Sequence, residues 1–582
     1  MSANATHHRV RAYRVELCAG AGACTPVGPA GLTLDLPTRS LVAGRVHDAH
    51  CALKGLPLTL LPTAAGGRCA VATFTARLDG PAIHTPRVRP LYGSNGTYAI
   101  EPVHIADAGE YSLSLRLDHQ NDAGMCACRA NESVTYLHQL LARSPTIIRA
   151  ADAPRAATVS PAPPRGLGTP PLGRWLRHNC STGAARGRLP PAEARYVDGW
   201  CAARGPRAAL LRRGEHVYVP STRGVRWRVL PLDFARDRAD AAASAGGERV
   251  FWLHVGGDSV IMRGELEELL ALFEGLNGTK YMLHNVTCLD VMGGRTLVRR
   301  TVCGDHRARG LKRTSHGLVN VHEWSFGELG GALGEDLGGA GRLIVSHHGG
   351  TGVPPPPVVA GCRGVDDVLP PPPGHRGREH HCNATHGAGS LYWSELFKLM
   401  RSSMRTNAAP DAIVYNYMLH YADSGRLCTS EYADYWRFAL RSVRAAYAGD
   451  VLWHTGLGTH FDAPGHGAVY RGQADGWPDG ARGIRYSWMC RSSSRIDRLR
   501  DEAGRVASEF GAHTLAADDI CAAWPMGTAD NRHFEGGFFN RRKQVVSITV
   551  LNALLNLLGD LASNDTRRHP DRRQSRVSAA VQ

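Results

Sequence analysis

A serine, an aspartate and a histidine occur in two short segments that together could perform acyl transfer. The first segment is GGDS at 256–259, where Ser259 follows an apolar run and precedes a helical pattern. The second is TADNRHF at 528–534, which places Asp530 three residues before His533. A serine hydroxyl becomes a nucleophile when an imidazole removes its proton, and a carboxylate beside that imidazole fixes its tautomer. These three residues therefore predict a catalytic triad.

Each segment also has a purely structural interpretation. Serine is a favoured N-cap residue, so Ser259 could simply begin the helix that follows it. Asp530 and His533 could equally lie in a surface turn. A tight glycine-rich turn between a strand and a helix, however, projects a hydroxyl group and offers backbone N–H groups to a developing oxyanion. The presence of both segments in one chain favours the catalytic interpretation.

Asn416 is a further polar residue in a suitable place, because it ends the apolar run AIVYN in AIVYNYMLH at 412–420. Its amide either donates a hydrogen bond to an oxyanion or merely closes the end of a strand, and the sequence leaves both roles open. Two histidine groups, HH at 347–348 and HTGLGTH at 454–460, lack the spacing of zinc ligands. We therefore expect no metal.

The elements that would position these residues follow from the apolar pattern. Runs such as RVFWLHV (249–255), RLIVS (342–346) and DVLWH (450–454) are typical of strands that are covered on both faces. They alternate with helical stretches such as EYADYWRFALRSVRAAY (431–447). This alternation predicts an α/β domain with a parallel sheet over residues 174–562, interrupted by a Pro-rich insertion at 352–375.

The preceding residues, 10–150, contain short alternating segments that are typical of β-strands. The stretch DAGEY, Asp107–Tyr111, resembles the tyrosine corner of immunoglobulin-like sandwiches, in which a tyrosine hydroxyl bonds back to the preceding turn. Leu113 stands where antibody domains have a cysteine, which favours a filamin-like or general immunoglobulin-like sandwich. A Pro/Ala-rich linker at 151–173 follows this domain, and a basic tail at 563–582 ends the chain.

The GGDS and TADNRHF segments together resemble the motifs of SGNH/GDSL-type hydrolases, and in particular of the PC-esterase branch, whose neurexophilin-like members also carry an N-terminal immunoglobulin-like domain. The resemblance implies a three-layer α/β/α fold, Ser259 as nucleophile, and Asp530 with His533 as the rest of the triad. It also implies Asn416 as an oxyanion donor, although Met418 stands where the family has glycine. The implied activity is O-acetyl transfer or O-acetyl ester hydrolysis on glycans, with no cofactor other than an acyl donor such as an acetyl-CoA-derived group. Transfer and hydrolysis use the same triad, so the sequence does not separate them.

Cysteines and glycosylation acceptors indicate the compartment. The chain has 15 cysteines, and eight of its sixteen asparagines begin an Asn-x-Ser/Thr acceptor, where chance predicts about two. The best glycosylation candidates are Asn95, Asn131, Asn277, Asn285 and Asn383. We expect disulfides and a place in the secretory pathway, in the Golgi lumen or outside the cell. The segments GRWLRHNC and YVDGWC, which end at Cys180 and Cys201, suggest a disulfide-stapled entry to the second domain, with the pairing left open.

The N-terminal residues MSANATHHRV lack the apolar stretch of a signal peptide, so a membrane anchor is expected only if the N-terminus is truncated. The apolar segment 545–562 carries Asn552 and Asn556, which favours a helix of the domain over a membrane span. The net charge of +16 comes mostly from arginine, but no nucleic-acid-binding motif accompanies it, and carbohydrate is the expected partner. The alternative is a non-catalytic secreted glycoprotein that binds a partner through its immunoglobulin-like and degenerate esterase domains.

Overall fold

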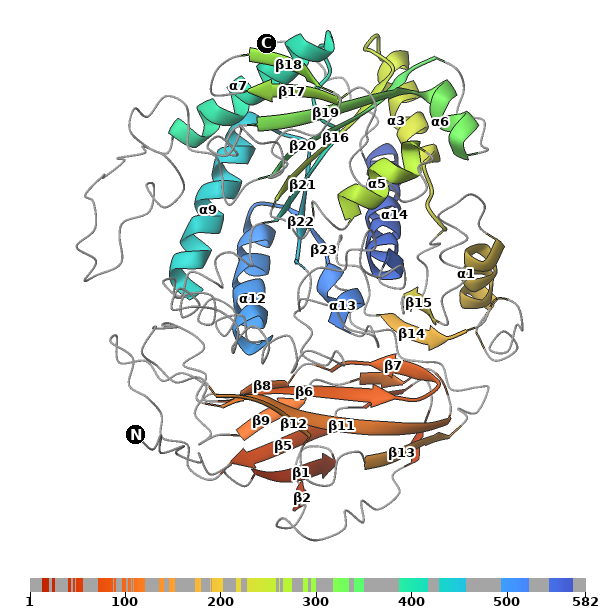
Figure 1. Cartoon of the computed structure of the whole chain (residues 1–582), viewed down its shortest axis with the longest axis vertical. Helices are drawn as coiled ribbons and strands as arrows, with labels where there is room; N and C mark the ends of the chain where they lie inside the picture. The colour runs from red at the N-terminus through yellow and green to blue at the C-terminus, as the bar shows by residue number, and fades with distance from the viewer. Residues whose placement is uncertain are drawn as a thin grey trace, which may run out of the picture.

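The structure is a computed structural model of the 582-residue chain, shown in Figure 1. It describes residues 13–19, 24–26, 40–42, 45–47, 49–55, 72–86, 88–90, 97–100, 103–105, 107, 109–120, 135–140, 146–151, 173–178, 180, 189, 191–202, 216–220, 228–257, 261, 265–274, 286–290, 295–299, 318–333, 340–349, 387–416, 429–456, 493–522 and 544–568.

The N-terminal part of the chain forms β-sheets, which occupy the lower part of Figure 1. One sheet has the strand order β2-β1-β5-β9-β8, and the other has the order β15-β14-β7-β6-β11-β13-β3, with β12 also paired to β11. The strands β10 and β4 pair with each other. The bounds are β1 Tyr13–Ala19, β2 Cys24–Pro26, β3 Ser40–Val42, β4 Arg45–His47, β5 Ala49–Gly55, β6 Ala72–Asp79, β7 Ala82–His84, β8 Val88–Pro90, β9 Thr97–Ile100, β10 Val103–Ile105, β11 Gly109–Gln120, β12 Thr135–Leu140 and β13 Thr146–Ala151.

The start of β11 carries the hydrogen bond that the DAGEY pattern predicts. The Tyr111 hydroxyl donates to the carbonyl oxygen of Asp107 at 2.9 Å. Tyr111 and Leu113 are buried while the serine between them is half-buried, as the alternation requires. Gly109 adopts a φ of 144°, and a Cβ atom there would lie 2.5 Å from Pro81 Cγ. Glycine is therefore needed where the turn enters the strand.

Two strands that follow the Pro-rich segment 151–173 join the second of these sheets. Strand β14, Gly173–Arg177, pairs with β7, and β15, His216–Pro220, pairs with β14. The sequence alone assigns these residues to the second domain, because local alternation carries no information about which strand is the partner. A disulfide between Cys180 and Cys201 fastens the end of β14 to helix α1, Pro191–Ala202. It resolves the pairing that the sequence left open.

The rest of the chain is built around one eight-stranded sheet of order β18-β17-β19-β20-β16-β21-β22-β23. The five strands from β20 to β23 in this order are parallel, and β19, β17 and β18 extend the sheet in antiparallel fashion. The bounds are β16 Val250–Gly257, β17 Val286–Asp290, β18 Arg295–Arg299, β19 Leu318–Ser325, β20 Arg342–Gly349, β21 Ala412–Asn416, β22 Asp450–His454 and β23 His513–Leu515.

Helices cover both faces of this sheet. Figure 1 shows α7, α9 and α12 on one face and α3, α5 and α14 on the other. The bounds are α3 Asp233–Ser244, α5 Glu265–Glu274, α6 Phe326–Leu333, α7 Gly387–Met404, α9 Thr429–Ala446, α12 Ser493–Glu509, α13 Ala517–Ala522 and α14 Gln544–Arg568. Because both faces are covered, every residue of the central strand β16 is buried.

Helical spacing of large apolar residues explains this packing. In α7, Trp393, Phe397 and Met400 are buried on one face of the helix. The Phe397 ring lies edge-on to the Trp252 ring of β16, with 6.2 Å between the centroids. On the opposite face of the sheet, Phe251 of β16 packs against Phe234 of α3 at 5.5 Å. Adjacent residues of β16 thus anchor the two helical layers.

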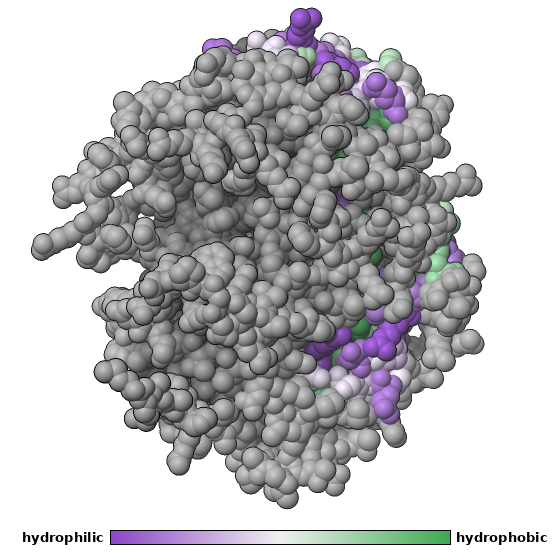
Figure 2. Space-filling view, in the orientation of Figure 1, coloured by the Kyte–Doolittle hydropathy of each residue, from purple (hydrophilic) through white to green (hydrophobic). Residues whose placement is uncertain are grey.

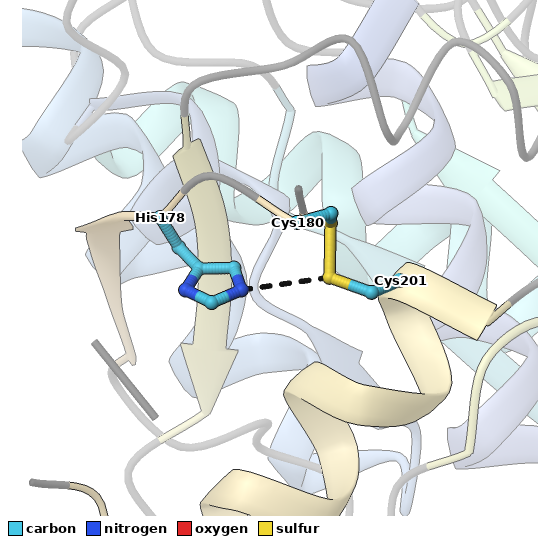
Figure 3. Close-up of a disulfide and its surroundings, with 3 residues drawn as sticks. All are labelled: His178, Cys180 and Cys201. Atoms are coloured by element: carbon cyan, nitrogen blue, oxygen red, sulfur yellow. Dashed lines mark hydrogen bonds between the residues drawn. A yellow bond between two sulfur atoms is a disulfide. The ribbon is translucent and has the colours of Figure 1, made fainter. Parts of the chain in front are cut away.

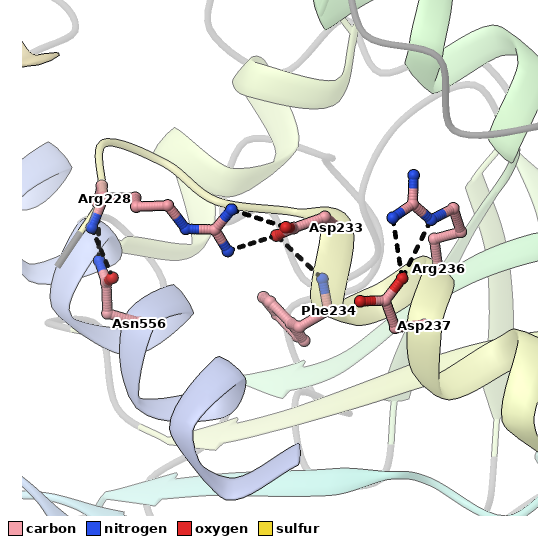
Figure 4. A network of polar contacts seen from close by, with 6 residues as sticks. All are labelled: Arg228, Asp233, Phe234, Arg236, Asp237 and Asn556. Carbon is pink, nitrogen blue, oxygen red and sulfur yellow. Dashed lines mark hydrogen bonds and ion pairs between the residues drawn. The ribbon is translucent and has the colours of Figure 1, made fainter. Parts of the chain in front are cut away.

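Helix α14 passes through the core, and its two asparagines hold the segment that leads into α3. The Asn556 side chain bonds both the backbone N–H and the carbonyl oxygen of Arg228, at 2.9 and 2.8 Å (Figure 4). Asn552 accepts the N–H of Leu230, a residue with a positive φ of 47°. Arg228 in turn clamps Asp233 at the start of α3 with two hydrogen bonds of 2.6 Å. The apolar stretch Val545–Ala562 is long enough to cross a membrane but is 83% buried inside the protein, as expected for a core helix.

Candidate active site

The carboxyl ends of the parallel strands meet at one edge of the sheet. Here Gly257, the last residue of β16, is in register with Gly349 of β20 on one side and Asn416 of β21 on the other. Among the parallel strands, the next one along the chain after β16 is β20, which lies on one side of it, and the one after that is β21, which lies on the other side. Such a reversal of direction opens a crevice beyond the strand ends, where ligands bind in open α/β sheets. The GGDS segment begins at this position.

Gly257 is fixed by its surroundings. A Cβ atom on this residue would lie 2.8 Å from the carbonyl oxygen of Asn416 and 3.0 Å from Ile261 Cδ1. Ile261 is helical and buried, so the chain passes from the strand to a helical residue within a few positions. Ser259 lies between them, two residues beyond the end of β16, and is outside the described residues. The structure thus describes the residues on both sides of the segment 258–260, which contains the expected nucleophile.

Asn416 ends β21, as the sequence predicts, and is 1% exposed. Its Nδ2 donates to the carbonyl oxygen of His454, the last residue of β22, at 2.5 Å. Its Oδ1 is buried and has no hydrogen-bond partner among the described residues. The amide therefore ties two strand ends together, which is one of the two roles that the sequence left open. An oxyanion role would use the second hydrogen of the same nitrogen.

The chain beyond β22 turns sharply. His454 Nδ1 accepts the N–H of Gly456 at 2.9 Å, and Gly456 has a φ of 78°, in the left-handed region that favours glycine. Because Nδ1 accepts, we assign the ring proton of His454 to Nε2. His460, the second histidine of the HTGLGTH segment, lies outside the described residues.

Helix α13 lies at the same edge and begins with a buried polar cluster that we call the Thr455 cluster: Thr455, Arg500, Asp497 and Asp518. The Thr455 hydroxyl donates to Asp518 Oδ1 at 2.5 Å and accepts the Asp518 backbone N–H at 3.2 Å. Arg500 forms ion pairs with Asp518 at 3.0 Å and Asp497 at 2.6 Å, and donates to the Thr455 carbonyl oxygen at 3.3 Å. Arg500 and Asp518 are 5% and 3% exposed, so each buried charge is paired. No local sequence signal marks this cluster, because its members come from three separate segments.

The two elements that flank residues 523–543 both face this edge. Helix α13 ends at Ala522, close to the Thr455 cluster. Gly559, in the carboxyl-terminal half of helix α14, lies beside Phe234. Phe234 in turn packs on Phe251, which is at the amino end of β16. At ~1.5 Å per residue, its start at Gln544 therefore lies toward the carboxyl edge. Asp530 and His533 lie between these elements, outside the described residues.

A buried histidine pair lies on β19 and β20 near this edge. The Nε2 atoms of His322 and His347 are 3.1 Å apart, and the two rings are stacked with 5.2 Å between centroids. Burial lowers the pKa of His322 to about 4, so its imidazole is neutral at neutral pH. The HH motif at 347–348 points to one partner, whereas His322 was not among the residues that the sequence singles out.

One group in the described part of the chain has the side chains of a metal site: His178, Cys180 and Cys201. The two sulfur atoms are bonded to each other, and His178 Nε2 lies 3.5 Å from Cys201 Sγ (Figure 3). A disulfide offers no thiolate to a metal ion. The group is therefore a disulfide with an adjacent histidine.

A cavity of about 430 Å³ lies at the opposite edge of the sheet, where β20 begins at Arg342. Its charged groups already have partners, since Arg342 pairs with Glu323 at 2.8 Å and Glu328 accepts from Ser325 at 2.8 Å. On the face shown in Figure 2, the coloured surface is mainly hydrophilic, with hydrophobic atoms in small groups. Neither feature brings together unpaired chemical groups among the described residues.

The glycosylation candidates Asn95, Asn131, Asn277, Asn285 and Asn383 all lie outside the described residues. No family model, curated protein or solved structure matches this chain.

Proposed function

We propose that this chain is an SGNH-like acyl-ester enzyme that acts on O-acetyl groups of glycans, with Ser259 as nucleophile, His533 as base and Asp530 as the residue that orients the base. The N-terminal sheets, in this proposal, form an immunoglobulin-like domain. Asn416 and the backbone N–H of Ser259 bind the oxyanion. No cofactor is required beyond an acyl donor, and carbohydrate is the partner.

The observation that carries the proposal is the position of Gly257. It ends the central parallel strand at the point where the strand order reverses, and its lack of a side chain allows contact with the Asn416 backbone. A serine two residues later, ahead of a helical residue, is suited to display its hydroxyl in the crevice. If Ser259 served only as the N-cap of a helix, it would not need to follow the strand at which the strand order reverses.

The reaction would proceed by double displacement. The Ser259 oxygen attacks the acetyl carbonyl carbon while His533 takes the serine proton, and the imidazolium is stabilised by Asp530. The bond from the acyl carbon to the sugar oxygen breaks, and that oxygen receives the proton from His533. Water or a second sugar hydroxyl then attacks acetyl-Ser259 and gives its proton to His533. The bond from the acyl carbon to the Ser259 oxygen breaks, and that oxygen takes the proton from His533, which restores the free enzyme. Water yields acetate, whereas a sugar hydroxyl yields a new acetyl ester.

The compartment belongs to the same proposal. An enzyme of the Golgi lumen or the extracellular space would meet glycans, carry N-linked sugars and form disulfides. The eight acceptor sequences and the Cys180–Cys201 disulfide support this placement.

Labelling with a fluorophosphonate probe tests the nucleophile. We expect the full chain to be labelled on Ser259, and Ser259→Ala to lose both labelling and acetyl release, with kcat falling by about 10⁶-fold. Ser442→Ala is the matched control, since Ser442 is a buried helical serine that bonds only to its own helix at Phe438. Peptide mapping locates the label, and acetylated polysaccharides with or without an acceptor sugar separate transfer from hydrolysis. Equal labelling of Ser259→Ala would refute Ser259 as the nucleophile, whereas a wild-type chain that is not labelled at all would favour a binding protein.

A further inference from the structure

We propose that helix α13 links the β-sheets of the N-terminal part to the candidate active site, with Trp175 and Asp518 as positioning residues for the reaction. This inference rests on the proposed function, because the groups that are positioned are those of the Asp530 and His533 segment.

The carboxyl end of α13 is held by a strand of the N-terminal sheet. Trp175 of β14 donates its indole N–H to the carbonyl oxygen of Ile520 at 2.8 Å. The last carbonyl groups of a helix have no partner within the helix, and α13 has only six residues. Trp175 is fully buried, so water does not compete for this carbonyl. The indole therefore acts as a cap on α13 that comes from another part of the fold.

The amino end of α13 is held by the sheet that carries the site. The Asp518 backbone N–H donates a hydrogen bond to Thr455 Oγ1. The Asp518 carboxylate accepts a hydrogen bond from the Thr455 hydroxyl and forms an ion pair with Arg500. Thr455 directly follows His454, whose carbonyl oxygen accepts a hydrogen bond from Asn416 Nδ2. Asn416 is in register with Gly257. A continuous set of contacts thus runs from α13 to the start of the GGDS turn.

Trp175 is itself held firmly. Its neighbour Arg174 is 2% exposed and bridges Asp107, at 2.5 Å, and Glu193 of α1, at 2.7 Å. The N–H of Gly173 donates to the Tyr218 hydroxyl at 2.7 Å. Beyond the strand, the disulfide fastens Cys180 to α1. A residue with these neighbours provides a fixed point for α13.

The consequence for the site is geometric. Helix α13 ends at Ala522, eight residues before Asp530 and eleven before His533, whereas Ser259 follows β16. The nucleophile and the base thus follow different elements in the chain, and the position of α13 sets where the segment with Asp530 and His533 begins. A misplacement of about 1 Å can lower a rate by about 10²-fold.

The test compares two buried tryptophans. Trp175→Phe keeps an apolar ring but removes the donor to Ile520. Trp200→Phe is the matched control, because Trp200 is also fully buried and its indole N–H has no partner. We expect the rate constant for fluorophosphonate labelling of Ser259, and kcat with KM unchanged, to fall by about 10-fold or more in Trp175→Phe relative to Trp200→Phe. The final labelled fraction should be equal, since loss of folded protein lowers this fraction and not the rate constant.

A second pair tests the other end of α13. Asp518→Asn removes the charge that Arg500 pairs with on α13, and Asp497→Asn removes the charge that Arg500 pairs with on its own helix α12. We expect the labelling rate constant to fall in Asp518→Asn and to stay within about twofold of the wild type in Asp497→Asn.

Two failures are distinguishable. If the wild-type chain is not labelled on Ser259, the proposed function is wrong. If it is labelled there but Trp175→Phe and Trp200→Phe react with equal rate constants, the proposed function stands and the role of α13 is refuted. A loss confined to the labelled fraction would likewise show that Trp175 only stabilises the fold.

Discussion

At the scale of single residues, Gly257 is closely confined. Its missing side chain lets β16 approach the Asn416 backbone, and the neighbouring Ile261 side chain fills the remaining space. The residue is needed for the contact between two strand ends, irrespective of what Ser259 does. It is therefore a position where stability and activity should change together.

Gly257→Ala places a methyl group 2.8 Å from a backbone oxygen, which cannot move as a flexible side chain would. We expect a loss of about 1–3 kcal/mol in the free energy of unfolding, as for other overpacked sites. Urea denaturation measures this loss, and fluorophosphonate labelling of Ser259 should slow in the same variant.

Gly199→Ala is the matched control, because the nearest atom to its new Cβ is Val229 Cγ2 at 3.6 Å. Gly199 lies inside α1, where alanine is favoured over glycine by about 0.5–1 kcal/mol. The control should therefore be as stable as the wild type or more so. Equal stability of the two variants would show that the sheet edge adapts to a side chain at position 257.

Local patterns predicted some residue contacts and missed others. The DAGEY motif predicted the Tyr111 bond to Asp107, because both partners lie in one turn. The apolar run before Asn416 predicted its place at a strand end. The Thr455 cluster was not predictable, since an arginine, a threonine and an aspartate from distant segments meet only after the sheet has formed. The three triad positions lie outside the described residues and stay a prediction.

At the scale of elements, the amino ends of the parallel strands share a charged cluster. Arg238 of α3 forms an ion pair with Asp450 at 2.9 Å and lies 4.0 Å from Asp411. Asp411 also accepts the backbone N–H of Trp252 at 2.8 Å. Desolvation raises the pKa of Asp411 to about 6 although Arg238 opposes this. For Asp450, desolvation is outweighed by His513, whose Nε2 lies 3.7 Å from the carboxylate, and by Arg238, and together they lower the pKa of Asp450 to about 2.

These two shifts have opposite effects on stability. Asp411, with its pKa raised in the folded state, contributes stability that is present below about pH 4 and is lost as the pH rises to about 6. Asp450, with its pKa lowered, contributes stability that is lost as the pH falls from about 4 to about 2. The cluster as a whole is therefore most stabilising near pH 4.

Asp411→Asn isolates the first effect, because the asparagine oxygen still accepts the Trp252 N–H. Between pH 4 and pH 6.5, the wild type should lose up to about 3 kcal/mol of unfolding free energy relative to this variant. Urea denaturation across this range measures the difference. The exposed Asp237→Asn, which alters an Arg236 pair on the outside of α3, is the control. Parallel pH curves for the wild type and Asp411→Asn would contradict the shift.

Apolar periodicity indicated the strands and helices around the central sheet, because each of them has a buried face that the 2.0 and 3.6 residue periods report. The pairing of β14 with β7, which adds β14 and β15 to the N-terminal sheet, was not predictable in this way. Their alternation shows that they are strands, but the partner is chosen by contacts such as those of Trp175 and Arg174 with distant segments.

At the scale of the whole molecule, the N-terminal sheets and the α/β part contact each other directly, since Trp175 of β14 donates to Ile520 of α13. Strand β14 pairs with β7, and its Arg174 bridges Asp107, beside β11, and Glu193 in α1. Helix α12 also contacts β6. Interfaces between independent domains are usually more exposed and more polar. We therefore expect the described parts of the chain to unfold together.

Arg174→Met tests this cooperativity. It leaves the partly buried carboxylates of Asp107 and Glu193 without their partner, which should cost about 3–5 kcal/mol. Arg177→Met on the same strand is the matched control, because the Arg177–Asp79 pair is exposed and should contribute about 1 kcal/mol or less.

Hydrogen exchange in increasing denaturant can follow peptides of β6 and β16 separately. If the parts form one cooperative unit, Arg174→Met lowers the protection of both peptides equally, since neither strand can unfold while the other keeps β14 and α13 in place. A loss of protection in β6 alone would mean that the N-terminal sheets unfold independently, and α13 could not then hold the site through them.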